Sequence, residues 1–349
     1  MSDEMYRQLA DALDRLPNGF PSTPSGLEIR VLKKIFSPED AGLAAQLHGE
    51  MEPLDAILAR LDPPQPDAQM RLKAMAKRGL IWVELREGKR WYRLAPFVVG
   101  IYEAQLENMD LEFAQLHEDY MAEGGAAGIM RPQPALHRVI PAQAAAKTEW
   151  ILPYDDVRAL VMNAKTFRVR DCICRLQRGT LGKACDAPLH NCISFYEMAL
   201  PETPYDLTVE QALALLDEAE EAALVHTVSN VAKGVSYVCN CCGCCCSLMR
   251  GINEYGIDQS VAAANYYAVI DPDACTGCGI CEGRCQVGAV VVGDIAVVDR
   301  ARCIGCGLCV SGCPEEAITL RLKPEAEIIH PPEDFATWER LRLKNRGIG

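Results

Sequence analysis

The stretch CTGCGICEGRC, residues 275–285, spaces its cysteines as Cys-x2-Cys-x2-Cys-x3-Cys, and CIGCGLCVSGCP, residues 303–314, repeats that spacing. The two copies are offset by 28 residues, and the same offset places Asp271 on Asp299 and one apolar run on another. The chain therefore contains an internal duplication, and each copy carries a complete cysteine motif.

Each copy has the spacing of a cubane iron-sulfur site. Three cysteines at x2 spacing wrap a tight, glycine-rich turn around one cubane, and the fourth cysteine, beyond x3, ligates the neighbouring cluster. We therefore expect two 4Fe-4S clusters. The expected ligands are Cys275, Cys278, Cys281 and Cys313 for one cluster, and Cys303, Cys306, Cys309 and Cys285 for the other.

Residues 267–323 resemble a two-cluster bacterial ferredoxin, from a first strand at YAVID to a last strand at AITLRL. The resemblance implies a small α+β unit with pseudo-twofold symmetry, two hairpins and two short helices. One departure is Gln286, which stands where the second copy has Pro314. A pair of zinc sites or disulfides is the alternative, but zinc motifs rarely use four cysteines in this unbroken spacing.

The composition indicates a globular protein that binds metal. With 349 residues and 49% apolar content, the chain is long enough for about two to three domains with hydrophobic cores. All 18 cysteines lie between Cys172 and Cys313, and at about 5% of the chain they are fewer than a disulfide-built secreted scaffold carries. This distribution favours metal ligation over cross-linking.

The N-terminus and the net charge bear on location and partners. MSDEMYRQLADALDRL has no apolar run behind a basic start, and no stretch approaches the roughly 18 apolar residues of a membrane span. We therefore expect a cytoplasmic protein with no membrane partner. The formal charge of -13 argues against nonspecific binding of the whole protein to nucleic acid or anionic lipid.

Ten further cysteines precede the duplication, six of them in CNCCGCCC, residues 239–246. Adjacent Cα atoms lie about 3.8 Å apart, closer than an unstrained disulfide allows. We expect at least one additional iron-sulfur cluster in residues 172–246, with a thiol/disulfide active site, zinc or an unfilled metal site as alternatives. The ten are Cys172, Cys174, Cys185, Cys192, Cys239, Cys241, Cys242, Cys244, Cys245 and Cys246.

The octet has more thiols than one cluster needs. If the first four upstream cysteines ligate one cluster, the octet can supply four ligands to a second cluster and still have two thiols left. In extended backbone, alternate residues face alternate sides, so these thiols cannot share one face unless Gly243 introduces a turn. We expect that turn, and with it a loop that serves two clusters or a cluster plus a reactive thiol pair.

The order CxCR, CNCCxCCC and two-cluster ferredoxin segment is similar to that of anaerobe-type multi-cluster iron-sulfur proteins, which implies cluster binding. Basic residues near the first four thiols would stabilise thiolates and a net-negative cluster. His190 and His226 are weaker ligand candidates, and we expect them to be surface or capping residues. The basic residues are Arg170, Arg175, Arg178 and Lys183.

The cysteine-free half has a different pattern. Helical periodicity marks LEIRVLKKIF, SPEDAGLAAQLHG, EPLDAILARLDP and PDAQMRLKAMAKRGLI, and a hairpin follows at IWVEL-REGK-RWYRL. This order resembles a winged helix. Residues 71–93 carry eight basic and two acidic residues, a net +6, which suits phosphate or an acidic partner protein, and we favour protein docking. A helix over about 97–123 and a linker at 121–134 are expected next.

We therefore predict a multidomain α+β protein. Its expected parts are a winged-helix-like domain with a helical arm (1–125), a cysteine-rich iron-sulfur module (126–266), a dicluster 4Fe-4S ferredoxin-like domain (267–323) and a C-terminal tail (324–349).

Adjacent cubanes transfer electrons without any additional assumption. The sequence therefore predicts an iron-sulfur electron carrier, or the electron-input subunit of a cytoplasmic oxidoreductase of anaerobic metabolism, in preference to a stand-alone enzyme. Its expected partner is a redox protein or an oxidoreductase complex. Two alternatives stay open: a redox-responsive winged-helix regulator that binds DNA, and a cluster-linked thiol/disulfide reductase that uses residues 239–246.

Overall fold

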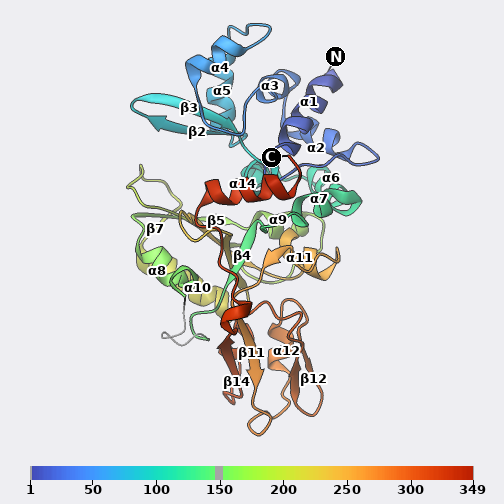
Figure 1. Cartoon of the computed structure of the whole chain (residues 1–349), viewed down its shortest axis with the longest axis vertical. Coiled ribbons are helices and arrows are strands. Elements are labelled where there is room, and N and C mark those ends of the chain that lie inside the picture. The colour runs from blue at the N-terminus through green and yellow to red at the C-terminus, as the bar shows by residue number, and fades with distance from the viewer. Residues whose placement is uncertain (1, 146–151, 349) are drawn as a thin grey trace. The chain divides into compact units, whose positions relative to one another are not determined.

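The computed structural model describes residues 2–145 and 152–348. The chain separates into two compact units, one formed by Met1–Pro132 with Arg340–Gly349 and the other by Gln133–Glu339. Each unit contains helices, and strands accompany them, so the α+β class is confirmed (Figure 1). Every helix in the described residues is too short or too polar to cross a lipid bilayer.

Three helices open the first unit and build its core. Leu9, Leu32 and Leu43, one from each helix, are fully buried. The Ser37 side chain starts the third helix by accepting a hydrogen bond from the Asp40 backbone N–H at 3.1 Å, which satisfies a donor that the helix itself leaves free. The helices are α1 (Ser2–Asp14), α2 (Leu27–Ile35) and α3 (Pro38–Ala44).

A small antiparallel sheet and two helices follow, as the sequence pattern predicts. The sheet has the order β1-β3-β2, and the β2–β3 hairpin turns at Glu87 and Gly88, both with positive φ. One face of the hairpin is open, because Val83 and Leu85 are exposed. The elements are β1 (Glu52–Pro53), α4 (Leu54–Arg60), α5 (Ala68–Lys77), β2 (Ile81–Arg86) and β3 (Lys89–Leu94).

The predicted single helix over 97–123 is wrong, because the chain turns twice within it. Gly100 has φ 169° and ψ -100°, outside the helical region. Further on, the Asp110 side chain begins a new helix by accepting a hydrogen bond from the Phe113 N–H at 2.8 Å. The segments are the helical turns η1 (Phe97–Ile101) and η2 (Glu103–Asn108), followed by α6 (Leu111–Tyr120).

The predicted linker at 121–134 is also wrong over most of its length. Its first ten residues continue as the helical turn η3 (Met121–Gly125) and the helix α7 (Ala126–Met130). Met121 and Ile129 are buried, so this segment belongs to the core of the first unit. The glycines that suggested a linker allow the sharp change of direction at Gly124, where φ is 131°.

The last helix, α14 (Phe335–Asn345), contributes a buried cation to the first unit. The Arg342 guanidinium donates hydrogen bonds to the backbone carbonyls of Pro17, Ile129 and Pro132. Burial lowers the pKa of this side chain to about 9. Through these three bonds, Arg342 fastens the chain end to the first unit.

The second unit is built on a seven-stranded sheet with the order β10-β4-β8-β9-β6-β5-β7. All neighbouring pairs are antiparallel except β10 and β4. The sheet places β9, which carries the first cysteines of the octet, between β8 and β6. The strands are β4 (His137–Ile140), β5 (Thr166–Asp171), β6 (His190–Tyr196), β7 (Asp206–Leu207), β8 (Val225–Ser229), β9 (Tyr237–Cys241) and β10 (Val261–Ala262).

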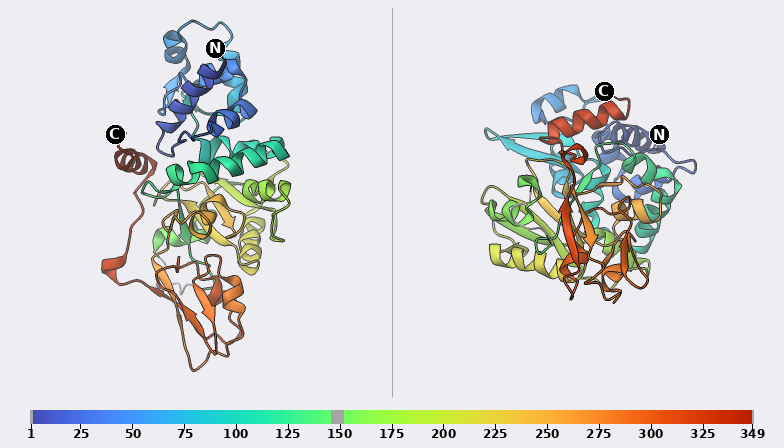
Figure 2. Two further views of the ribbon diagram at one scale, coloured as in Figure 1. Left: turned by 90° about the vertical axis from the view of Figure 1, so that its right-hand side faces the viewer. Right: turned by 60° about the horizontal axis from the view of Figure 1, so that its bottom comes forward.

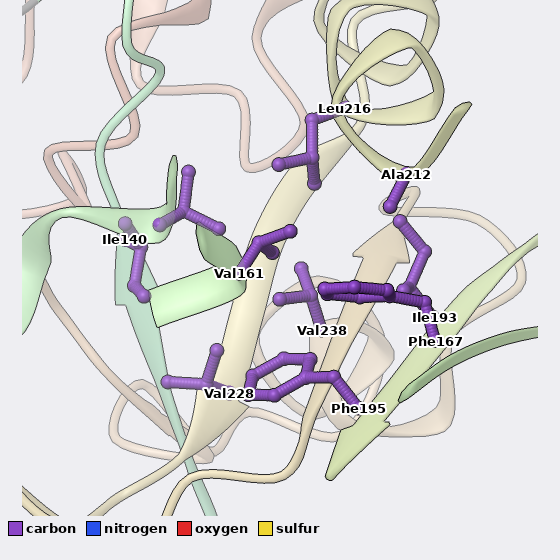
Figure 3. Close-up of a cluster of buried hydrophobic side chains, with 10 residues drawn as sticks. Ile140, Val161, Phe167, Ile193, Phe195, Ala212, Leu216, Val228 and Val238 are labelled. Carbon is purple, nitrogen blue, oxygen red and sulfur yellow. The ribbon is translucent and has the colours of Figure 1, made fainter. Parts of the chain in front are cut away.

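Two helices cover one face of this sheet and enclose its core (Figure 3). The helices are α8 (Val157–Met162) and α10 (Val209–Glu221), and α10 starts with a reciprocal capping box between Thr208 and Gln211. The buried core residues are Ile140, Val157, Val161, Phe167, Ile193, Phe195, Ala212, Leu216, Val228 and Val238.

Residues 266–322 form a small lobe of the second unit, the orange and brown part of the ribbon in Figures 1 and 2. Its first and last strands pair antiparallel, with Tyr266 opposite Leu322, and its two middle strands form a hairpin. The halves repeat the order strand, helix, strand, as the duplication predicts. They are β11 (Tyr266–Ile270), α12 (Ile280–Arg284) and β12 (Val290–Val292), then β13 (Ala296–Val298), α13 (Leu308–Ser311) and β14 (Ile318–Leu322).

Candidate functional site

The first four-cysteine group of the lobe lines one small cavity. Cys275, Cys278 and Cys281 come from the turn before α12 and from α12 itself, and Cys313 comes from the other half of the repeat. The backbone N–H of Ala296 donates a hydrogen bond to the Cys275 sulfur at 3.4 Å. Four convergent thiols with backbone donors to sulfur fit a 4Fe-4S cluster.

The turn around this cavity needs glycine. Gly277 and Gly279 have φ of 66° and 82°, in the left-handed region that L side chains rarely adopt. A Cβ atom on Gly277 would lie 2.5 Å from the Asp294 carbonyl oxygen. The second copy repeats this conformation at Gly305 and Gly307, with φ of 70° and 76°.

The second group contains the remaining four cysteines of the lobe. Burial, together with the nearby thiols of Cys303 and Cys285, raises the pKa of Cys306 to about 12. Burial, followed by the nearby thiols of Cys306 and Cys303, also raises the pKa of Cys309. Thiols of this kind ionise when a bound metal compensates the charge. The Cys285 sulfur accepts a hydrogen bond from the Ala289 N–H at 3.1 Å, so this group fits a second cluster.

The lobe is fastened to the rest of the second unit by backbone contacts at its cysteine motifs. The Ala142 N–H donates to the Cys306 carbonyl at 2.8 Å. The Arg284 guanidinium donates to the Leu308 carbonyl within the lobe at 2.7 Å and to the Glu220 carbonyl at the end of α10 at 2.6 Å. These contacts fix the position of the second cysteine group against the sheet.

Upstream, four thiols form a tight group, here called the quartet, which consists of Cys185, Cys242, Cys244 and Cys245. Their sulfur atoms all lie within 4.8 Å of one another. Cys185 comes from the loop after α9 (Ile173–Thr180), and the other three come from the turn after β9. The expected turn at Gly243 is confirmed, because residues 243–245 form it.

The six other upstream cysteines form a wider ring, here called the sextet. The Cys172 thiol contacts the thiols of Cys174 and Cys192, and the sulfurs of Cys192 and Cys239 lie 4.0 Å apart. Cys246 closes the ring through contacts with Cys174 and Cys241. The sextet therefore consists of Cys172, Cys174, Cys192, Cys239, Cys241 and Cys246.

In the structure, the ten upstream thiols do not divide into the first four cysteines and the six of the octet. Cys185 does not join the other three early cysteines but faces the octet. Cys239 and Cys241 alternate along β9 and face the sextet, whereas Cys242 begins the turn and faces the quartet. One short loop therefore supplies thiols to two groups, which is the two-sided arrangement that the turn predicts.

One basic residue near these groups is in direct contact with sulfur. Arg175 is buried, and its Nη2 atom lies 3.4 Å from the Cys242 sulfur. The Cys245 thiol and then Arg175 lower the pKa of Cys242 to about 4, against the opposing effect of burial. Arg170 and Lys183 are exposed and Arg178 is half-buried.

The two histidines differ: His190 is a surface residue, as expected, whereas His226 is neither a surface nor a capping residue. His190 is exposed and pairs with the Asp171 carboxylate at 2.8 Å. His226 is buried, with Nδ1 at 2.7 Å from the Asn240 side-chain oxygen and Nε2 at 3.3 Å from a Glu220 carboxylate oxygen.

A chain of hydrogen bonds that the sequence pattern did not indicate leads to the sextet. The Tyr237 hydroxyl lies 2.7 Å from His137 Nε2, and His137 Nδ1 lies 3.2 Å from the Thr227 hydroxyl. The Thr227 hydroxyl lies 3.4 Å from the Cys241 sulfur. These residues come from β9, β4 and β8, and neighbouring strands bring them together only in the folded sheet.

Gln286 connects the lobe to the quartet. Its side-chain oxygen accepts a hydrogen bond from the Gly243 N–H at 2.7 Å. The Asn253 side chain, at the end of α11 (Ser247–Asn253), donates to the carbonyls of Gly243 at 3.0 Å and Gln286 at 2.9 Å. The residue that departs from the ferredoxin pattern thus holds the loop, and it directly follows the cluster ligand Cys285.

Comparison with protein families identifies the lobe. A family model for the 4Fe-4S binding domain matches residues 268–291 and again residues 296–319. No curated protein and no solved structure gave a significant match to the chain. The tandem match confirms a ferredoxin segment with two 4Fe-4S clusters near the C-terminus, and supports an iron-sulfur electron-transfer role.

Proposed function

We propose that this chain is an electron carrier or the electron-input subunit of an oxidoreductase, in which the ferredoxin lobe exchanges electrons with a partner and with a further iron-sulfur cluster upstream. The observation that carries the proposal is the link from the ligand Cys285 through Gln286 to Gly243. It joins a ferredoxin cluster site to the loop that supplies both thiol groups, without an intervening element.

The residues of the lobe are suited to this task. A 4Fe-4S cluster, when bound, accepts and releases single electrons, and hydrogen bonds to its sulfurs, burial and net charge set its potential. The chain supplies N–H donors from Ala289 and Ala296 to cysteine sulfurs. Cys281 and Cys309 are buried, which limits solvent access to each site.

We further propose that the sextet holds a third iron-sulfur cluster. Its thiols come from the start of α9, from β6, from β9 and from the start of α11, so they surround a common space from several sides. A cubane uses four thiolates, and two of the six would remain. Those two are the basis of the reductase alternative, because a thiol pair beside a cluster can undergo disulfide exchange.

The first unit is proposed to be a winged-helix-like docking module. Support comes from the order α3, β1, α4, α5, β2, β3 and from the sheet order β1-β3-β2. Part of its positive charge is already compensated, since Arg71 and Arg78 both contact Asp40 and Arg86 contacts Glu84. This pairing favours a protein partner over DNA.

The exposed side chains of the hairpin agree with that preference. Val83 and Leu85 are exposed on β2, and Trp82 is partly exposed, with the Arg93 guanidinium 4.6 Å from its ring centre. A surface of apolar, aromatic and cationic groups is typical of protein interfaces. Salt-dependent retention on immobilised duplex DNA, at the level of a winged-helix regulator, would instead support the DNA-binding alternative.

Iron and acid-labile sulfide analysis of the full chain, purified without oxygen, tests the cluster content. About eight irons and eight sulfides per chain correspond to the ferredoxin lobe alone, and about twelve of each correspond to a third cluster. Reoxidation of the dithionite-reduced protein by a one-electron acceptor tests electron transfer. A protein with a full set of clusters that neither accepts nor releases electrons would refute the carrier role.

A further inference from the structure

We propose that the quartet, Cys185, Cys242, Cys244 and Cys245, binds a single tetrahedral metal ion, zinc or iron, through four thiolates. This site is distinct from the two ferredoxin clusters and from the sextet. It does not require the electron-transfer proposal, because its geometry alone distinguishes it from a cluster site.

The distances between the sulfurs fit one ion. A tetrahedral ion with metal–sulfur bonds of about 2.3 Å holds its sulfurs about 3.8 Å apart. The sulfur of Cys185 lies 3.7 Å from that of Cys242 and 3.8 Å from that of Cys245. The sulfurs of Cys244 and Cys245 lie 3.7 Å apart, and all four lie within 4.8 Å of one another.

The ferredoxin groups of the same chain provide the comparison. A cubane spreads its four thiolates over four irons, so its cysteines must lie further apart than those of a single ion. Within residues 2–145 and 152–348, the quartet is the one group whose sulfurs meet the 4.8 Å spacing. Pairs of sextet sulfurs also lie close together, such as those of Cys192 and Cys239 at 4.0 Å, but in the described residues neither the sextet nor the ferredoxin cysteines form a group of three or more at this spacing.

The local backbone is preorganised for a single ion. Cys242 and Cys245 have the x2 spacing that two ligands of a four-cysteine metal site commonly show. The Cys242 sulfur accepts a hydrogen bond from the Cys245 N–H, and the Cys246 N–H donates to the Cys242 carbonyl at 3.3 Å. The turn brings both thiols to one side, where Cys185 faces them.

The surroundings offset the charge of such a site. Four thiolates around a divalent ion carry a net charge of about -2. The Arg175 guanidinium, itself buried, lies 3.4 Å from the Cys242 sulfur and supplies one compensating charge. Ala219 and Leu224 pack against Cys242 and Cys245, and their apolar side chains cover this side of the site.

Metal and sulfide analysis of a Cys244→Ala variant of the full chain tests this site. Cys244 is exposed, so its removal leaves the core unchanged, and Cys278→Ala is a matched control because Cys278 is also exposed. We expect Cys244→Ala to lose about one metal ion per chain with its acid-labile sulfide unchanged. The control should lose about four irons and four sulfides.

X-ray absorption on the unaltered protein gives a readout that does not depend on folding of the variant. Zinc at the site should show about four sulfurs at roughly 2.3 Å and no metal neighbour. Iron at the site should instead give an excess of about one iron over acid-labile sulfide per chain. Equal loss of iron and sulfide from Cys244→Ala, full metal retention by that variant, or unaltered protein with no zinc and with iron equal to sulfide would each overturn the proposal.

Discussion

Replacing Gly243 by alanine should release the thiol-rich loop. A Cβ atom at this position would lie 2.1 Å from the Gln286 carbonyl oxygen and 2.7 Å from the Asn253 side-chain nitrogen. The first of these is a backbone atom next to Cys285, so it cannot move aside as a flexible side chain would. Overpacking of this kind typically costs about 1 to 3 kcal/mol.

The hydrogen bonds around Gly243 give a second, independent value for the loss of stability. If the loop moves away, it loses the bond from the Gly243 N–H to the Gln286 side chain and the bond from the Asn253 side chain to the Gly243 carbonyl. At about 1 kcal/mol each, these two bonds amount to about 2 kcal/mol. This loss lies within the range expected for overpacking.

Anoxic urea unfolding of the full chain, followed by circular dichroism, measures this loss. A decrease of about 2 kcal/mol should lower the midpoint of the transition that includes the second unit by about 1 M. Gly283→Ala is the matched control, because a Cβ atom at Gly283 in α12 meets no atom within 4 Å. That variant should be unchanged or slightly more stable. Equal midpoints for Gly243→Ala and the unaltered protein would refute the reasoning.

Three further changes have defined outcomes. Cys306→Ala should remove one ferredoxin cluster, seen as the loss of about four irons and of one reduced-state magnetic resonance signal; retention of both signals contradicts the ligand assignment. Burial lowers the pKa of His137 to about 4, so the folded state favours the neutral side chain. The free energy of unfolding of the second unit should therefore fall by about 2 kcal/mol as the pH drops from about 6.5 to 5. In urea titrations at pH 7 and pH 5, His137→Gln should remove this pH dependence, and an unchanged dependence refutes the prediction. Arg342→Met should destabilise the first unit by about 3 kcal/mol, since three carbonyls lose their donor; calorimetry checks this, and an unchanged melting temperature contradicts it.

The sequence predicts most of the ferredoxin lobe because its constraints are local. Three of the four ligands in each motif lie within seven residues, and the glycines at 277 and 305 mark the turns between them. The exchange of the fourth ligand between the halves follows from the x3 spacing. In agreement with it, Cys285 of the first motif is among the thiols that act on Cys309 of the second motif. In this lobe, the spacing of the cysteines along the chain is enough to predict the ligands of each cluster, and the tertiary structure adds little to that assignment.

The upstream site is much less predictable, because its contacts join residues that are distant in the chain. Cys185 and Cys242 are separated by 57 positions, and the intervening strands decide which thiol faces which group. Gln286 illustrates the same limit. The sequence shows it as a departure from proline, but only the fold reveals that its side chain reaches Gly243.

The helical arm after the hairpin shows why periodicity alone misleads. The apolar spacing in 97–123 suggests one continuous helix, yet Gly100 and the capping residue Asp110 interrupt it. The aromatic side chains Phe97, Tyr102 and Tyr120 then meet in one core cluster, which a straight helix could not achieve.

The exchange of Cys285 and Cys313 between the two halves of the lobe has a consequence for biogenesis. Neither half owns a full ligand set, so a ribosome that has released only the first motif has produced three ligands for the nearer cluster and one for a cluster that does not yet exist. The ligand set of the first cluster is complete only when synthesis has passed Cys313, although its other three cysteines are made much earlier. The first motif must therefore stay available until the second motif has been made, and insertion of the first cluster depends on both halves of the lobe.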